Sequence, residues 1–356
     1  MDKKHALKLP AFLLPFITIC LLAGCGKNDE NSSPTAPEDQ PEVGSYYVDI
    51  HDSEQTCEGT TLFTDSHDSE NIRVVEVDMN GEVVWEFTVP SDWINGNLVG
   101  FETELLENGN ILLVMSRSGI YEIDRDGNLV WLHQDPDCSH DADRLANGNT
   151  IYVFGNHDEK GDPCVKEVDA QGHQVWSWVP YDYYYTAPYN EVDYQGWVHC
   201  NGVTRLDNGN TLLSPRNFDM TLIVNPQGTP VWEYKWQDLY TNATEFPAFF
   251  PHDPEIHPDG TLLVCLQVQS PYQVVEINQS TGEVNWEYYR ENFRTCRDAD
   301  RLPNGNVLVV GVMMDTNESV IFEVTPDKEI VWQLRLYQIP VGQAPGHFFK
   351  AQRIVQ

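Results

Sequence analysis

Three histidines, an asparagine and an arginine are the residues of this sequence whose types could bind and attack an anionic group. They are His140, His199, Asn201, His252 and Arg297. A neutral imidazole is a competent nucleophile near pH 7, and a covalent intermediate on it divides one group transfer into two easier steps. An arginine attracts an anion and can bind two of its oxygens at once. Their chemistry predicts a site for a small anionic group, provided that the fold brings these distant residues together.

A repeated sequence pattern supplies such a fold. Segments such as GEVVW, GNLVW and GEVNW recur and end in tryptophans that are between 45 and 56 residues apart. These are Trp85, Trp131, Trp176, Trp232, Trp286 and, without the preceding glycine, Trp332. Most copies follow an Asn-Gly or Asp-Gly turn with alternating aliphatic residues, which is a strong hairpin signal. Since this period is typical of propeller blades, we predict an all-β, six-bladed β-propeller.

The two ends of the repeated region indicate how the ring closes. The first unit begins at residues 59–63 and has no innermost strand before it. Residues 349–354 align with residues 297–302, which form an innermost strand in the last unit. We therefore predict that the C-terminal strand completes blade one, because a closed ring removes the free edges of a sheet array.

The repeat also places the polar residues in register. One equivalent position, near the start of each innermost strand, holds Phe349, Phe101, His140, Asn201, His252 and Arg297. His199 lies two residues before Asn201. Innermost strands surround the propeller axis, so these residues are expected to converge at one mouth of the channel. Strand alternation turns Asp141 and Asp253 away from their histidine neighbours, and we predict that such acids hydrogen-bond between blades.

Two segments resemble the bacterial arylsulfate sulfotransferases. Residues 197–203 read WVHCNGV and residues 213–217 read LSPRN, which is similar to the family pattern Trp-x-His-x-Asn followed by an arginine. The pairs His140-Asp141 and His252-Asp253 match two His-Asp pairs of the family. The resemblance covers essentially the whole chain after the leader. It implies a cofactor-free propeller that moves a sulfuryl group from an aryl sulfate to a phenol without a nucleotide sulfate donor.

The resemblance also implies a role for each matching residue. His252 would be the nucleophile that forms a sulfohistidine, and the sulfuryl group would be bound by His140, His199, Asn201 and Arg216. Arg297 joins this binding set through its position in the repeat. The best-studied family members carry an N-terminal β-sandwich, in place of which this chain has a short tether.

A non-catalytic alternative remains open, namely a ligand-binding or scaffold propeller lipoprotein of the cell envelope. The propellers of the outer-membrane assembly machinery, and those that bind quinone cofactors, usually have eight blades and need no histidines at one mouth. Three converging histidines could also hold zinc or copper. Because Arg216 and Arg297 would repel a cation there, we predict no metal.

The beginning of the chain predicts export and lipid anchoring. Residues 1–24 have a basic start and a short apolar run, which is typical of a signal peptide. They end in Leu-Ala-Gly before Cys25, which resembles a lipobox with Cys25 as the acylated residue. Gly26 after this cysteine favours the outer over the inner membrane of a bacterial cell envelope. Residues 25–44 predict a disordered tether, and residues 45–356 the propeller.

Charge and cysteine content add two further expectations. The net charge of −34 argues against nucleic acid as a partner. Six cysteines follow Cys25, and they are Cys57, Cys138, Cys164, Cys200, Cys265 and Cys296. Their spacing matches no zinc motif, and some could pair in an oxidising compartment. A Cys138–Cys164 disulfide is the favoured pairing because both residues flank one predicted hairpin, with inert buried thiols as the alternative.

Overall fold

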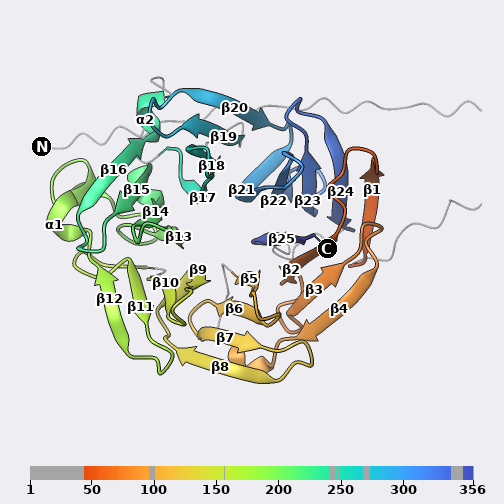
Figure 1. The fold of residues 1–356 in the computed structure, drawn as a ribbon, viewed down its shortest axis with the longest axis horizontal. Coiled ribbons are helices and arrows are strands. Elements are labelled where there is room, and N and C mark those ends of the chain that lie inside the picture. Colours follow the sequence, from red (N-terminus) through yellow and green to blue (C-terminus); the bar gives the residue numbers. More distant parts are fainter. Residues whose placement is uncertain are drawn as a thin grey trace, which may run out of the picture. The chain divides into compact units, whose positions relative to one another are not determined.

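Each repeat unit folds into one blade of a propeller. The computed structural model describes residues 44–95, 101–155, 157–239, 246, 248–267, 273–337 and 348–355. All of them belong to the structural unit Pro41–Gln356. Six antiparallel sheets surround one axis in this unit (Figure 1), which confirms the predicted all-β, six-bladed propeller.

The first three blades contain four strands each, in the following order from the axis outward. Blade 1 contains β25 (Ala351–Ile354), β2 (Thr60–Asp65), β3 (Arg73–Val77) and β4 (Val83–Thr88). Blade 2 contains β5 (Phe101–Leu105), β6 (Ile111–Met115), β7 (Gly119–Ile123) and β8 (Leu129–Gln134). Blade 3 contains β9 (Cys138–Arg144), β10 (Thr150–Phe154), β11 (Val165–Val168) and β12 (Gln174–Trp178).

The other three blades continue the same order. Blade 4 contains β13 (Cys200–Arg205), β14 (Thr211–Pro215), β15 (Met220–Val224) and β16 (Pro230–Lys235). Blade 5 contains β17 (Pro251–Ile256), β18 (Thr261–Leu266), β19 (Gln273–Asn278) and β20 (Val284–Tyr289). Blade 6 contains β21 (Phe293–Arg301), β22 (Val307–Met313), β23 (Ser319–Val324), β24 (Ile330–Leu336) and β1 (Tyr46–His51).

Two strands from opposite ends of the sequence close the ring. β25 pairs with β2 and supplies the innermost strand of blade 1, as predicted. β1 pairs with β24 and adds a fifth, outermost strand to blade 6, which the repeat did not predict. Blades 1 and 6 are neighbours, so both closing strands act at the same junction (Figure 1).

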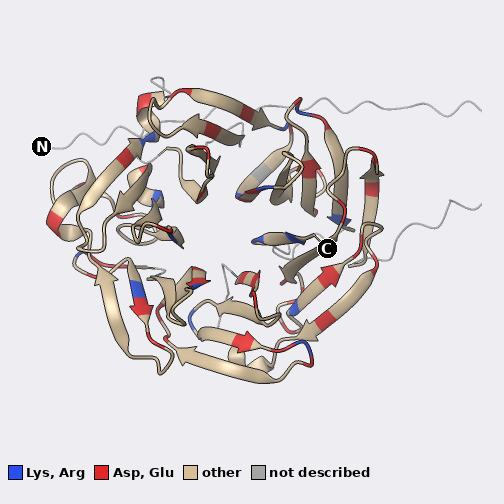
Figure 2. Ribbon diagram, viewed as in Figure 1, with Lys and Arg blue, Asp and Glu red and all other residues tan. Residues whose placement is uncertain are grey.

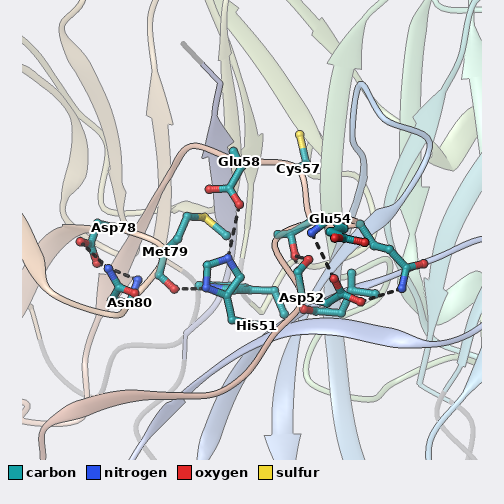
Figure 3. A network of polar contacts seen from close by, with 12 residues as sticks. His51, Asp52, Glu54, Cys57, Glu58, Asp78, Met79 and Asn80 are labelled. Carbon is teal, nitrogen blue, oxygen red and sulfur yellow. Dashed lines mark hydrogen bonds and ion pairs between the residues drawn. The ribbon is translucent and has the colours of Figure 1, made fainter.

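The repeat tryptophans join each blade to the next. Every one of the six indoles donates its Nε1–H to a backbone carbonyl in the turn between the third and fourth strands of the following blade. The acceptors of Trp85, Trp131, Trp176, Trp232, Trp286 and Trp332 are Arg125, Ala170, Pro226, Gln279, Pro326 and Met79. The last of these bonds closes the ring, and Figure 3 shows the polar contacts around this junction, including Met79 and the His51–Glu58 pair.

The core lies between adjacent blades. All residues of β6 and β23 are buried, because the middle strands of a blade have a neighbouring blade against each face. The outermost strands β4 and β8 alternate between exposed and partly buried residues, as expected for strands with one solvated face. Acidic residues occur on innermost as well as outer strands (Figure 2), so part of the negative charge belongs to the strands nearest the axis.

In the described part of the chain, helical structure is limited to short segments between strands. These are α1 (Tyr181–Tyr184), α2 (Trp236–Leu239) and the 3-10 turns η1 (Ser91–Trp93), η2 (Tyr189–Glu191) and η3 (Arg216–Phe218). Within the residues that the structure describes, no helix has the length and apolar character needed to cross a membrane. The predicted signal peptide, Cys25 and most of the tether lie outside the described residues.

Candidate active site

Backbone irregularities at the start of four innermost strands position the predicted site residues. The pairing of β9, β13, β17 and β21 with the next strand shifts register where each strand approaches the channel mouth. The shifts occur next to His140, Asn201, His252 and Arg297. A bulge of this kind bends the strand and re-aims one side chain. The repeated hairpin therefore supplies the strands, and the bulges set the direction of the functional side chains.

Positive backbone φ angles accompany these bulges. His140 has φ 52°, His199 has φ 48° and Asp253 has φ 45°. A left-handed conformation is costly for residues other than glycine, and it persists only where the surrounding structure imposes it. Here the imposed conformation turns imidazoles of blades 3 and 4 toward each other, with ring centroids of His140 and His199 4.9 Å apart.

The predicted residues gather in one buried cluster. His140, His199, Asn201, Arg216 and His252 are all buried, although they come from blades 3, 4 and 5. Burial lowers the pKa of His140 well below its usual value. Nearby groups lower this pKa further and therefore lie within electrostatic range of His140; they are His199, His252, Arg216 and Arg297. Asn201 is buried two residues after His199, at the start of β13.

Hydrogen bonds assign the protons on two of the imidazoles. The Nδ1 of His252 lies 2.8 Å from the carbonyl oxygen of Phe250, and the Nδ1 of His199 lies 2.8 Å from that of Gln195. A carbonyl can only accept, so each Nδ1 carries the proton and each Nε2 keeps a lone pair. The side-chain amide of Gln267 donates to the Nε2 of His252 at 3.2 Å, which agrees with this tautomer.

Burial keeps these histidines neutral. It lowers the pKa of His252 well below the usual value, and the charges of Arg216 and Arg297 lower this pKa further. Burial and Arg216 likewise lower the pKa of His199 to about 3. Removing an imidazolium from water is unfavourable, and nearby guanidinium groups add repulsion. At neutral pH the cluster thus presents unprotonated Nε2 atoms beside permanent positive charges.

Several polar atoms in the cluster lack a protein partner among the described residues. They are Nδ2 and Oδ1 of Asn201 and Nδ1 of His140. Buried polar groups are nearly always hydrogen-bonded, so these atoms are available to bind water or a ligand. Together with the two arginines, they suit a compact group that offers several acceptor oxygens.

Aromatic rings enclose Arg216 and Arg297. The guanidinium carbon of Arg216 lies 4.6 Å from the ring centroid of Phe250 and 5.4 Å from that of Tyr194. The corresponding atom of Arg297 lies 4.6 Å from the ring centroid of Phe349, which comes from the C-terminal segment. Such rings interact favourably with cations and add apolar surface next to the polar cluster.

A partly buried lysine near the cluster joins several blades. The Nζ of Lys350 lies 2.8 Å from a carboxylate oxygen of Glu102, 2.9 Å from Asp141 and 2.8 Å from Asp253. Burial alone would lower the pKa of Lys350, but carboxylates led by Asp141 raise it well above its usual value. Lys350 is therefore a permanent ammonium ion at the axis, bonded to blades 2, 3 and 5.

The acids near the axis confirm the predicted bonding between blades. Asp141 accepts the backbone N–H of Val203 in blade 4, and Asp298 accepts that of Ala351 in blade 1 at 2.8 Å. Asp253 in blade 5 bonds across blades through Lys350, which directly precedes β25 of blade 1. Asp253, Asp298 and Asp300 have oxygens within 4.8 Å of one another, and the Lys350 ammonium already neutralises charge at this place.

Several residues of the site were missed by the sequence reasoning. Gln267 follows β18 and Phe250 precedes β17, and no motif distinguishes either of them. Tyr194 and Gln195 lie in the long connection between β12 and β13. The wider spacing between Trp176 and Trp232 was the available signal for this connection, since an insertion there must lie at the end of a blade.

The predicted Cys138–Cys164 disulfide is wrong. All six described cysteines are buried, and no two of them are joined in this structure. The thiol of Cys138 lies 3.5 Å from the carbonyl oxygen of Met115 in blade 2. The thiol of Cys164 instead contacts Cys200 of blade 4. Flanking one hairpin does not bring the two side chains together, because they pack against different neighbouring blades.

Comparison with known proteins supports the family resemblance. The family model for arylsulfotransferase (ASST) matches residues 47–236, which are more than half of the chain. This match includes His140, His199, Asn201 and Arg216. No curated protein sequence matches the chain significantly.

Solved structures share the fold at low sequence identity. A protein of unknown function from Bacteroides caccae has a TM-score of 0.57 and 16% identity, over 84% of this chain and 100% of that chain. A streptogramin B lyase has a TM-score of 0.52 and 18% identity, over 87% and 88% of the two chains. These likenesses concern the propeller alone, whereas the match to the family model is specific in sequence. The chain belongs to the arylsulfotransferase family.

Proposed function

We propose that this propeller transfers a sulfuryl group from an aryl sulfate to a phenolic acceptor through a sulfohistidine at His252. The observation that carries the proposal is the neutral imidazole of His252, with its Nδ1–H bonded to the Phe250 carbonyl. Its Nε2 lone pair is thereby available next to two guanidinium groups. A nucleophile and positive charges for the sulfuryl oxygens are the two requirements of this transfer.

In the first half-reaction, the Nε2 of His252 attacks the sulfur of the aryl sulfate. An N–S bond forms while the bond between sulfur and the aryl oxygen breaks, and the phenolate leaves with the electron pair of that bond. The Nδ1–H keeps its hydrogen bond to the Phe250 carbonyl, and this bond stabilises the positive charge that develops on the imidazole ring. The amide of Gln267 gives up its bond to Nε2 and can then donate to a sulfuryl oxygen.

The remaining polar residues stabilise the sulfuryl group as its bond to oxygen breaks. Arg216 binds two of its oxygens, and the unpartnered amide of Asn201 donates to a third. Their buried environment strengthens these interactions because water does not compete. In the second half-reaction, a phenol oxygen attacks the same sulfur and the N–S bond returns its electron pair to Nε2. The proton of this phenol passes through water to the phenolate that left in the first half-reaction.

The aromatic rings next to the cluster favour an aryl group in donor and acceptor. Tyr194 is 48% exposed, and its ring centroid lies 5.7 Å from that of Phe250. A planar substrate ring can pack against this surface while its sulfate reaches Arg216. Offset and edge-to-face packing of such rings is favourable.

The test is an assay of the full chain with a chromogenic aryl sulfate, with and without a phenol. We expect phenol-dependent release of the chromophore, and a gain of one SO3 group on the peptide that contains His252 when the acceptor is omitted. The variant His252→Asn should lose both, while His133→Asn, on the outer strand β8, should keep both. Release that is equal in the His252→Asn variant would refute the mechanism.

The same assay separates catalysis from the non-catalytic alternative. A scaffold or ligand-binding propeller would show no turnover. It would still bind an aryl sulfate if the cluster served recognition, and Arg216→Gln would weaken that binding. Turnover by the wild-type chain excludes this alternative.

We further propose that the chain is exported and held at a bacterial membrane by lipid on Cys25. The motif Leu-Ala-Gly-Cys at residues 22–25 supports this proposal. Labelled fatty acid should enter the wild-type protein in a bacterial host and not the Cys25→Ser variant. Equal labelling of both proteins would contradict the proposal.

A further inference from the structure

Four of the six described cysteines form two contacting pairs. The thiols of Cys164 and Cys200 are hydrogen-bonded, and so are those of Cys265 and Cys296. All four side chains are at most 1% exposed. Each pair lies within one hydrophobic cluster, so the surrounding packing holds the two sulfurs together.

Each pair lies at a junction between two blades. Cys164 directly precedes β11 in blade 3, and Cys200 begins the innermost strand of blade 4. Cys265 lies in β18 of blade 5, and Cys296 lies in the innermost strand of blade 6. Each pair thus connects one blade to the innermost strand of the next, at the junctions 3–4 and 5–6.

Both pairs lie directly beside the candidate active site. Cys200 is between His199 and Asn201 in the sequence, and Cys296 precedes Arg297. Cys265 is the register partner of His252. The strands that carry the nucleophile and its neighbours are therefore the strands that the pairs would join.

We propose that Cys164–Cys200 and Cys265–Cys296 form two disulfide bonds that fix the site-bearing strands to neighbouring blades. In each case two thiols exchange with a disulfide-bearing oxidoreductase or a small-molecule disulfide. One S–S bond forms in the protein, the S–S bond of the oxidant breaks, and the oxidant leaves as two thiols that carry the two protons and two electrons.

The burial of the thiols determines at which step of folding this exchange occurs. In the closed ring, burial raises the pKa of Cys164 and Cys265 well above the usual value, which suppresses the reactive thiolate. Exchange therefore takes place while neighbouring blades are still docking. Export, as the leader predicts, would place that step in an oxidising compartment.

The first test counts and maps thiols in the full chain after folding under oxidising conditions. The protein is unfolded with an alkylating agent and digested without reductant. We expect linked peptides for Cys164–Cys200 and Cys265–Cys296, with alkyl groups on Cys57 and Cys138. Alkylation of all six described cysteines, or linkage in another pattern, would overturn the proposal.

The second test measures the effect of the bonds on stability. Reductant should lower the midpoint of thermal unfolding of the wild type by roughly 5–10 °C. The double variant Cys164→Ser/Cys265→Ser should start lower and respond no further to reductant. The control Cys138→Ser should keep the response, because Cys138 contacts a backbone carbonyl and not a thiol. A wild-type midpoint that is independent of reductant would contradict the proposal.

Discussion

Blades 3 to 6 and blades 1 and 2 share one architecture but differ at the channel mouth. The innermost strands of blades 3 to 6 shift register next to a histidine, asparagine or arginine. In blade 2, β5 pairs with β6 without interruption, and in blade 1, β25 pairs regularly with β2. The candidate active site therefore lies where the innermost strands are bulged and not where their pairing is regular.

The outer rim of the propeller shows no such division. All six repeat tryptophans donate the same hydrogen bond to the following blade. These six bonds hold neighbouring blades at the same spacing around the ring. The starts of the innermost strands can therefore differ in backbone conformation from blade to blade. Conformational strain at His140 and His199 can persist because the ring around them is held independently.

The largest expected effect concerns the stability that Lys350 provides. This residue directly precedes β25 of blade 1 and pairs with Glu102 of blade 2, the two blades with regular pairing. Lys350→Met removes the ammonium that binds the buried carboxylates of Glu102 and Asp141 and the partly buried one of Asp253, and leaves those charges uncompensated. We expect the free energy of unfolding to fall by about 3–5 kcal/mol. Lys235→Met removes an exposed pair with Glu233 and should cost at most about 1 kcal/mol. Denaturant titration measures both, and equal losses would show that the axial lysine has no special role.

The next effect tests the bulged blades. Arg216→Lys keeps the positive charge but removes the planar fork that binds two oxygens. We expect kcat/KM for an aryl sulfate to fall by about 10²-fold with little change in unfolding. Arg205→Lys, at a residue that pairs with Glu167 away from the site, should leave kcat/KM unchanged. A wild-type rate in Arg216→Lys would remove this residue from the mechanism.

The pH dependence distinguishes the site histidines from ordinary ones. The folded-state pKa of His199 is lowered to about 3, so below pH 6.5 the unfolded chain takes up a proton that the folded chain does not. The contribution of His199 to the free energy of unfolding is therefore fully present above pH 6.5. It falls by about 1.4 kcal/mol per pH unit as the pH decreases from 6.5 to about 3. His199→Gln should make that slope shallower. An imidazole NMR titration near pH 6.5 for His199 would contradict this assignment.

The smallest effects concern the rim. Trp176→Phe removes one indole hydrogen bond and should cost about 1 kcal/mol of unfolding free energy. Trp332→Phe should cost more, about 1–3 kcal/mol, because this fully buried indole donates to a carbonyl at the ring closure. If the two variants lost the same amount, burial at the closing junction would not matter.

The sequence was sufficient to predict the blades and most of the site. Turn residues and Trp85 to Trp332 mark each hairpin, and counting from the turns places His140, Asn201, His252 and Arg297 at one mouth. Gln267 and the thiol pairs could not be predicted in this way. They depend on how adjacent blades pack against each other, and local periodicity contains no information on that packing. The added strand β1 carries no repeat signal for the same reason, since it pairs only with the outer edge of β24.

The closing strand has a consequence for when the protein becomes competent. Phe349 and Lys350 directly precede β25, so the ring around Arg297 and the ion pairs at the axis arrive with the last strand to leave the ribosome among those described. A nascent or truncated polypeptide that lacks this segment has four bulged blades but no completed site. If the proposed function holds, a polypeptide without β25 and the two residues before it should therefore not turn over an aryl sulfate.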